Sequence, residues 1–375
     1  MNTKIYIFSV NDLNTTAYYF KKASQQMGYR VIYLTKNFNT KILKPNDIFL
    51  YIDPVKDFPF FLEKVTCRTA AYFIDVHLGL EQRLIFSNFF DYLFIAQKDY
   101  VEIFKKYRNL SNKTSNKKNN NSNNIKWLPL ACDPDVHFKK SLKRKIDVSF
   151  IGQINKLTSR NRYDVINKVL TNFKTNNYKK FYKNDEMGKI YSSSKIIFNK
   201  SVNNDLNMRF FEGICSGGLL VTDKIKNGVN DLFLNKFHYI SYNSAKDAIH
   251  KISYYLKNDK DRKLIAERGQ KLVMKSHTYK HRLATILNLI SRKKYENNFS
   301  AAPIKNLNNK NVSLQYAKVF FILTKPLKIA QLMFIYNFNI RVFFLFFKSV
   351  LKYLNSVVPM TPGSIRIKIF NVFKF

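Results

Sequence analysis

Residues 197–223 read IFNKSVNNDLNMRFFEGICSGGLLVTD, and they contain the clearest alternation of strand and helix patterns in the chain. An apolar run ends near Asn199, a polar loop follows, and from about Asn207 the apolar residues recur at helical spacing. Gly217 and Gly218 then turn the chain into a second short apolar run. A buried strand, a helix and a second buried strand in this order predict one βαβ unit of a parallel sheet.

The same alternation continues along the chain on both sides of this unit. Apolar runs that are too short for helices predict strands at 5–10, 31–34, 47–52, 69–75, 92–96, 147–152, 195–199, 219–222 and 239–241. Amphipathic patterns predict helices at 15–27, 160–173, 184–193, 207–216, 245–257, 259–274 and 278–292. Two successive β-α series predict an α/β fold of two doubly wound, Rossmann-like domains that face one another across a cleft.

Composition sets the expected domain limits. We place the N-terminal domain at residues 1–140 and the C-terminal domain at residues 141–295, with a hinge in the polar stretch 139–145. Residues 109–124 consist mainly of Asn, Ser, Lys and Thr, so they cannot bury enough apolar surface to offset the entropy of ordering. They predict a disordered surface loop.

The pattern changes in residues 300–375. Between 316 and 354, aromatic and aliphatic residues are mixed with Lys and Arg every several positions. This mixture predicts a helical tail that lies on an anionic membrane surface, and a helical pair packed on the two domains is the alternative. No segment reaches the roughly 18 apolar residues that cross a bilayer, and the N-terminus lacks the apolar region of a secretory signal. We therefore expect a cytoplasmic protein, peripheral on the inner face of the cell membrane.

The charge and the cysteines exclude little chemistry. The net charge is +39, which suits nucleic acid, an anionic membrane or a polyanionic substrate, although Lys and Asn crowd the loops throughout the chain. A basic nucleic-acid-binding protein is thus one alternative, but the sequence contains no recognisable reader module, and we expect no nucleic-acid partner. Cys67, Cys132 and Cys215 lie far apart without CxxC spacing, which argues against a disulfide framework or structural zinc.

Charged residues near the ends of the predicted strands indicate where a ligand binds. Arg209 and Glu212 are three residues apart and share one face of the predicted helix. A carboxylate can accept hydrogen bonds from two vicinal ribose hydroxyls, and a guanidinium can neutralise a diphosphate. An ordinary surface ion pair is the alternative. Gly152 ends another predicted strand, and the helix after it, whose N-terminus suits a phosphate, carries Arg160 and Arg162.

The stretch 197–223 resembles the donor-site segment of GT-B glycosyltransferases, particularly the CgeB-like group. The residues that carry this resemblance are Asn199, Asp205, Asn207, Arg209, Glu212, Gly217 and Gly218. Further segments are similar to that group in order and spacing, so that the resemblance covers roughly residues 70–290: 71–77, 91–100, 127–135, 147–152 and 277–282.

The resemblance implies an enzyme that transfers a sugar from a nucleoside diphosphate to an acceptor hydroxyl without a metal or other cofactor. In such an enzyme Glu212 binds the donor ribose and Arg209 neutralises the departing diphosphate, and the donor-binding set also includes Gly152, Arg160, Arg162, Asn199, Asn207, Gly217 and Gly218. Asn204 stands where many retaining GT-B enzymes carry a second glutamate, which leaves the stereochemical outcome open.

Asp75 and His77 are the catalytic candidates of the N-terminal domain. They follow the predicted strand 69–75, so they would face the donor across the cleft, and either side chain can deprotonate an acceptor hydroxyl. A helix-capping role is the alternative for Asp75. No DxD-type acidic cluster follows a strand in the second domain, so no metal site is expected.

We expect the acceptor to be a glycan or a lipid-linked molecule in cell-surface glycan synthesis, because the tail would bring the enzyme to a membrane. A protein that has the GT-B fold but lacks transferase activity is the second alternative.

Overall fold

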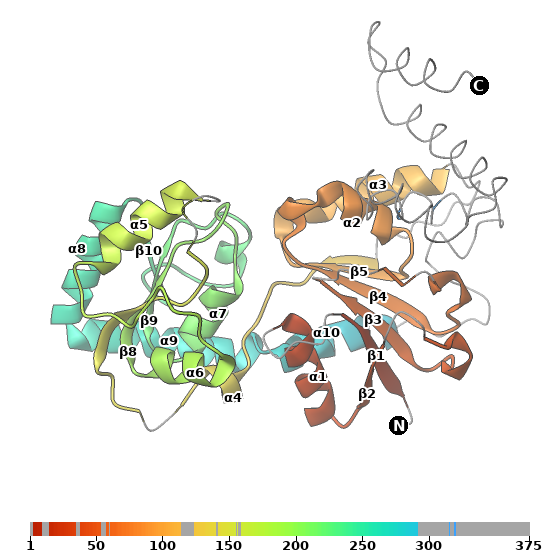
Figure 1. The fold of residues 1–375 in the computed structure, drawn as a ribbon, viewed down its shortest axis with the longest axis horizontal. Helices are drawn as coiled ribbons and strands as arrows, with labels where there is room; N and C mark the ends of the chain where they lie inside the picture. The colour runs from red at the N-terminus through yellow and green to blue at the C-terminus, as the bar shows by residue number, and fades with distance from the viewer. Residues whose placement is uncertain are drawn as a thin grey trace, which may run out of the picture.

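The computed structural model describes residues 3–9, 15–34, 38–53, 58–59, 61–113, 124–139, 142–154, 156, 159–291, 315 and 319. These residues form two α/β domains, each built on its own parallel sheet (Figure 1). The predicted fold class, with two Rossmann-like domains, is thereby confirmed. The predicted tail at 300–375 lies outside the described residues except for 315 and 319.

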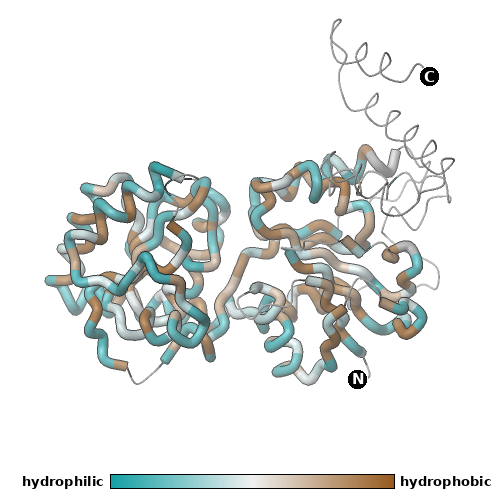
Figure 2. The backbone as a smooth tube through the Cα atoms, viewed as in Figure 1, coloured by the Kyte–Doolittle hydropathy of each residue, from teal (hydrophilic) through white to brown (hydrophobic). Residues whose placement is uncertain are grey.

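The N-terminal sheet has six strands in the order β2-β1-β3-β4-β5-β6, and all neighbouring strands are parallel. Such strands are covered on both faces, which explains their nearly continuous apolar sequences. Helices pack on both faces of the sheet, and brown apolar segments follow its strands (Figure 2). The strands are β1 (Lys4–Phe8), β2 (Arg30–Tyr33), β3 (Ile48–Ile52), β4 (Arg68–Phe73), β5 (Tyr92–Ile95) and β6 (Ile125–Trp127), and the helices between them are α1 (Thr16–Gln26), α2 (Leu80–Ser87) and α3 (Val101–Lys113).

The C-terminal sheet has the parallel order β10-β9-β8-β7. Val148 of β7 also forms a parallel bridge with Thr175 on the side away from β8. The strand order therefore reverses between β7 and β8, and ligands of open α/β sheets bind at the carboxyl ends of such a pair. The strands are β7 (Ile146–Ser149), β8 (Ser194–Asn199), β9 (Leu219–Asp223) and β10 (Ile240–Tyr242), and the helices are α4 (Pro134–His137), α5 (Arg160–Leu170), α6 (Asn184–Ser192), α7 (Met208–Cys215), α8 (Ala245–Lys257), α9 (Asp259–Ser276) and α10 (Tyr279–Ser291).

The helix α10 lies in the N-terminal domain, although the sequence prediction gave residues 141–295 to the C-terminal one. It packs against α1, as Figure 1 shows, and Arg68 of β4 donates a hydrogen bond to the carbonyl of Ile290. The pattern of apolar residues in α10 predicts a buried face, but it does not say which sheet that face covers.

The chain crosses between the domains at residues 128–133 and again at 276–279. The two crossing segments are joined by backbone hydrogen bonds, from Cys132 N to His277 O at 3.2 Å and from Tyr279 N to Cys132 O at 3.1 Å. The described residues of the predicted hinge, 139 and 142–145, belong to the C-terminal domain instead, since Arg144 Nη2 donates to Ser216 O at 2.9 Å. The crossing is therefore earlier in the chain than the polar composition suggested.

Two other expectations concern polar or terminal segments. Helix α3 continues to Lys113, so the first residues of the predicted disordered loop 109–124 are helical. The reason is that extending an existing helix by one residue gains a backbone hydrogen bond at little cost. Residues 114–123 lie outside the described part of the chain. Among the described helices, none combines the length and apolar character that crossing a bilayer requires.

Candidate functional site

Arg209 lies over the carboxyl ends of β7 and β8. It is in the first turn of α7, which begins just beyond β8, and the side chain of Asn207 caps this helix by accepting from Phe210 N at 3.2 Å. The guanidinium donates from Nε to the Ile151 carbonyl and from Nη1 to Asn199 Oδ1 at 2.8 Å. This is the point where the strand order reverses, as expected for a ligand-binding residue.

Gly152 is in direct contact with Arg209. A Cβ added at position 152 would overlap Nη2 of Arg209. Only a residue without a side chain lets the guanidinium lie this close to the backbone. The structure thus brings these two predicted residues together.

Arg162 supplies a second positive charge next to the first. It is 8% exposed, and it donates from Nε to Lys200 O at 3.0 Å. Its guanidinium carbon lies 5.4 Å from the centre of the Phe150 ring, and that of Arg209 lies 4.5 Å from the same ring centre. Burial lowers the pKa of Arg162 to about 10, with a smaller contribution from Arg209. The guanidinium of Arg162 therefore remains charged at neutral pH, and together with that of Arg209 it suits an anionic ligand.

Arg160 was predicted to belong to the same set, but the structure places it elsewhere. Its side chain is 81% exposed, and its Nε lies 4.0 Å from Asp164 Oδ2. Residues two apart on a helix point in nearly opposite directions, so Arg160 and Arg162 cannot both face the strand ends. The prediction for Arg160 is wrong for this geometric reason.

The two predicted asparagines support Arg209 rather than line an open surface. Asn199 is fully buried and donates from Nδ2 to Thr222 Oγ1 at 3.0 Å, while its Oδ1 accepts from Arg209. The amide of Asn207 contacts the amide of Asn199 at 3.3 Å besides capping α7. These bonds fix both the start of α7 and the position of its arginine.

Gly217 and Gly218 lie at the opposite edge of the sheet. Helix α7 starts at the carboxyl edge of β8 and returns to the beginning of β9, so its end is at the amino edge of the strands. Gly217 has φ 74° and ends the helix, and an added Cβ would lie 2.8 Å from Gln270 Nε2. The prediction that these glycines bind the donor is wrong, because they form the turn into β9.

Glu212 is buried where α7 meets α4 and α1. Its Oε1 lies 3.4 Å from His137 Nε2, and Tyr19 Oη of the N-terminal domain lies 3.4 Å from the same nitrogen. His137 Nδ1 accepts a hydrogen bond from Asp133 N at 3.0 Å, so the proton of the neutral ring is on Nε2 and faces Glu212. Because Glu212 is only 6% exposed and Arg209 bonds to Asn199, the surface ion-pair interpretation is wrong.

Burial controls the protonation of this group. It lowers the pKa of His137 to about 3, so the ring is neutral. It raises the pKa of Glu212 to about 7, against the opposing effect of the Arg209 charge. Glu212 can therefore gain or lose its proton near neutral pH.

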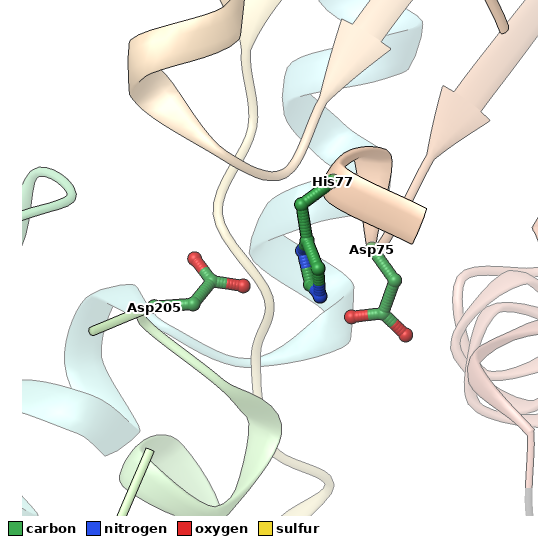
Figure 3. Close-up of side chains that lie close together, drawn as sticks. All are labelled: Asp75, His77 and Asp205. Atoms are coloured by element: carbon green, nitrogen blue, oxygen red, sulfur yellow. The ribbon is translucent and has the colours of Figure 1, made fainter. Parts of the chain in front are cut away.

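Asp75 and His77 meet a residue of the other domain. They flank Val76 at the start of the 3-10 helix η3 (Val76–Leu78), and Asp75 does not cap this helix with its side chain. Both side chains point toward Asp205 of the C-terminal domain, and one ligand atom from each of the three residues lies within 4.8 Å of the others (Figure 3). The predicted site residues did not include Asp205, although it is one of the residues that carry the resemblance to the donor-site segment.

This cluster has the donor atoms for a divalent cation, namely two carboxylates and one imidazole. However, both oxygens of Asp205 already accept amide hydrogens, from Gln97 Nε2 at 2.9 Å and from Asn227 Nδ2 at 2.8 Å. A bound metal would have to share these oxygens. Desolvation raises the pKa of Asp75, His77 lowers it and Asp205 raises it further, so Asp75 holds a proton more strongly than an ordinary aspartate.

Comparison with known proteins agrees with this geometry. Residues 137–288 match a family model described as "Glycosyl transferase-like". No curated protein sequence matches the chain.

Three solved structures share the fold. Anabaena HepE in complex with UDP is 8% identical with a TM-score of 0.54, over 78% of this chain and 100% of that chain. A glycosyltransferase from Rickettsia africae ESF-5 is 12% identical with a TM-score of 0.52, over 78% of this chain and 99% of that one. T4 phage BGT in complex with UDP and Mn²⁺ is 12% identical with a TM-score of 0.50, over 77% and 99%. At such identities the likeness concerns the fold alone, and the CgeB-like subgroup stays a prediction. Residues 137–288 thus match the glycosyl transferase-like family model, and the two domains of the chain have the fold of GT-B glycosyltransferases.

Proposed function

We propose that this protein is a glycosyltransferase that moves a sugar from a nucleoside-diphosphate donor to an acceptor hydroxyl. The observation that carries the proposal is a pair of guanidinium groups at the point where the order of the C-terminal strands reverses, the buried one of Arg162 and the half-buried one of Arg209. The fold relatives HepE and BGT hold UDP in their solved structures, which supports a nucleoside diphosphate as the leaving group here.

In the proposed reaction, the bond between the anomeric carbon and the diphosphate oxygen breaks, and the diphosphate leaves with the electron pair. Arg162 and Arg209 neutralise the developing negative charge. The carboxylate of Glu212 accepts hydrogen bonds from the ribose hydroxyls. The acceptor oxygen attacks the anomeric carbon, and its proton passes to Asp75 or to His77, which face the C-terminal domain at Asp205.

The reaction is proposed to proceed without a metal, because two guanidinium groups supply the charge that a cation would otherwise provide. The measurement is the transfer rate before and after treatment with EDTA. An unchanged rate is expected. A loss of activity that Mn²⁺ or Mg²⁺ restores would assign the Asp75, His77 and Asp205 cluster to a metal and contradict this part of the proposal.

We place the enzyme in the cytoplasm on the inner face of the membrane, where it serves cell-surface glycan synthesis with a glycan or lipid-linked acceptor. The sequence of residues 300–375, rich in Phe, Lys and Arg, supports a membrane-docking role. The full chain is expected to sediment with anionic vesicles, and a variant that ends at residue 299 is expected to remain in the supernatant. Equal sedimentation of both proteins would remove the membrane role of the tail.

The donor is identified by measuring the melting temperature with UDP-, GDP-, dTDP- and CMP-sugars. A ligand that binds only the folded protein raises the melting temperature, so one group of donors should do so. Glu212→Ala should lose this effect. If no nucleotide shifts the melting temperature while the protein is retained on immobilised RNA in a salt-dependent way, the nucleic-acid-binding alternative replaces this proposal.

A further inference from the structure

A buried glutamine joins the two domains at the cluster that contains Asp75 and His77. Gln97 follows β5 and is 1% exposed. Its Oε1 accepts a hydrogen bond from Val76 N at 3.3 Å, and its Nε2 donates to Asp205 Oδ2 at 2.9 Å. Val76 stands between Asp75 and His77 in the sequence, whereas Asp205 belongs to the loop between β8 and α7. The side chain of Gln97 thus connects the segment that carries Asp75 and His77 in the N-terminal domain with the loop between β8 and α7 in the C-terminal domain.

The chemistry of this contact requires an amide. The carbonyl oxygen of Gln97 accepts from a backbone N–H, and its amino group donates to a carboxylate. A glutamate at this position could accept from Val76 but would place a second carboxylate beside Asp205. A leucine of similar size could make neither bond and would leave the buried carboxylate of Asp205 without one of its donors.

The same carboxylate is held from its own domain as well. Asn227 Nδ2 donates to Asp205 Oδ1 at 2.8 Å, and Asn227 Oδ1 accepts from Asp99 N of the N-terminal domain at 3.2 Å. Gln97, Asp205 and Asn227 are all more than nine-tenths buried. Hydrogen bonds to a buried charged group contribute more to stability than exposed ones do. This network therefore connects the segment around Val76 firmly to the loop that contains Asp205.

An exposed ion pair crosses the same boundary and provides a comparison. Lys98 Nζ lies 2.8 Å from Asp231 Oδ2, and both side chains are 46% exposed. Exposed pairs of this kind contribute little to stability. Lys98 is the sequence neighbour of Gln97. A substitution of Lys98 therefore perturbs the same boundary between the domains but leaves the hydrogen bonds of Asp205 in place.

We infer that Gln97 is a positioning residue for sugar transfer: it fixes the loop of Asp75 and His77 relative to the donor segment through Val76 and Asp205. The inference rests on the proposed function. Gln97 itself touches no substrate in this arrangement. Its effect is to hold the catalytic side chains of the N-terminal domain at the reacting distance from a donor that the C-terminal domain binds.

The test separates transfer from nucleotide binding. Gln97→Leu is expected to lower kcat by about tenfold or more, because small displacements of catalytic groups cost that much. The Kd for UDP, measured by calorimetry, should change less than about twofold, since Arg162, Arg209 and Glu212 lie in the other domain. Lys98→Met should leave both quantities unchanged. A Gln97→Leu protein with wild-type kcat, or one whose UDP affinity falls as much as its kcat, would overturn the inference.

A pair of substitutions tests the polarity of the bond. Gln97→Glu alone should lower kcat at least as much as Gln97→Leu, since two carboxylates would face each other. In the double variant Gln97→Glu with Asp205→Asn, the amide at position 205 donates and the carboxylate at position 97 accepts. We expect kcat to recover by at least about half of the loss on a logarithmic scale. A double variant no better than Gln97→Glu would contradict the inference, and this pair also serves if Gln97→Leu fails to fold.

A readout that needs no substrate distinguishes this inference from the proposed function. Hydrogen exchange of the Val76 amide should be faster in Gln97→Leu than in the wild type or in Lys98→Met. If the amide responds in this way but the wild-type protein neither binds UDP nor transfers sugar, the proposed function fails and the positioning role fails with it, while the contact stands. If the wild type is active and the amide does not respond, only the positioning role fails.

Discussion

The guanidinium of Arg209 occupies the space in which a side chain at position 152 would stand, so that Gly152 and Arg209 depend on one another. The glycine comes from the loop after β7 and the arginine from the first turn of α7. Their contact joins the carboxyl ends of β7 and β8, where the strand order reverses. A positive charge is thereby placed where an open parallel sheet binds its ligand.

Gly152→Ala should weaken nucleotide binding without unfolding the protein. The added methyl group overlaps Arg209 Nη2, and the guanidinium has to leave the Ile151 carbonyl or Asn199 to make room. We expect the Kd for UDP to rise by about tenfold, which corresponds to about 1.4 kcal/mol. Calorimetry gives the affinity, and an unchanged circular dichroism spectrum is the control. Wild-type affinity in the variant would show that Arg209 does not contact the nucleotide.

The fold was predictable because the apolar runs are short and regularly separated by amphipathic helices. The pattern at 197–223, for example, corresponds closely to β8, α7 and β9. The pattern does not show which sheet a helix covers or at which edge of the sheet the helix ends. It could not show that α10 covers the N-terminal sheet, since an apolar face fits either sheet. It also placed Gly217 and Gly218 in the site, although a helix that runs back along its strand ends at the edge away from the ligand.

The candidate site was predictable only where the residues are close in sequence. Arg209 and Glu212 share a helix. Helical spacing also shows that Arg160 and Arg162 point in different directions, so that only one of them can face the strand ends. In contrast, Asp205 and Gln97 are 108 residues apart and lie in different domains. Both lie in segments that carry the resemblance, but no pattern in the chain predicted that they are in contact.

Arg162 and Arg160 form a matched pair for testing the position of the diphosphate. Arg162→Ala removes a buried guanidinium next to Phe150 and Arg209, and should raise the Kd for UDP by about tenfold or more. Arg160→Ala removes the same charge from an exposed position two residues earlier, and should change the Kd by less than about twofold at physiological salt. The comparison cancels the effect of net charge. Equal losses in the two variants would mean that the nucleotide responds to charge in general.

The protonation of Glu212 should control the pH dependence of nucleotide binding. The carboxylate form accepts hydrogen bonds from both ribose hydroxyls, whereas the protonated form accepts them less well. Because burial raises the pKa of Glu212 to about 7, the affinity for UDP should fall as the pH is lowered from 8 to 6. Glu212→Gln should bind UDP more weakly than the wild type at pH 8 and should lose this part of the pH dependence. An identical slope in both proteins would assign the titration to another group.

The same shift predicts how stability changes with pH. The pKa of Glu212 in the folded protein, about 7, is above its ordinary value of 4.5, so the folded state holds this proton more strongly than the unfolded state. The resulting stabilisation is complete below pH 4.5 and is lost as the pH rises through 7. Between pH 5 and 8 the wild type should therefore lose stability, on the order of a few kcal/mol, relative to Glu212→Gln. Urea unfolding of both proteins at several pH values measures this difference, and a constant difference would show that Glu212 has an ordinary pKa.

Asp75 and His77 can be distinguished as bases by the acid limb of the kcat profile. The base must be deprotonated to accept the proton of the acceptor hydroxyl, so kcat falls as the pH is lowered through its pKa. Desolvation raises the pKa of Asp75, which moves this limb to a higher pH than that of an ordinary aspartate. Asp75→Asn should lower kcat by about 100-fold or more and abolish the limb, with little change in the Kd for UDP. His77→Gln should keep the limb and lose less activity; if it is instead His77→Gln that abolishes the limb, the imidazole is the base and Asp75 orients it.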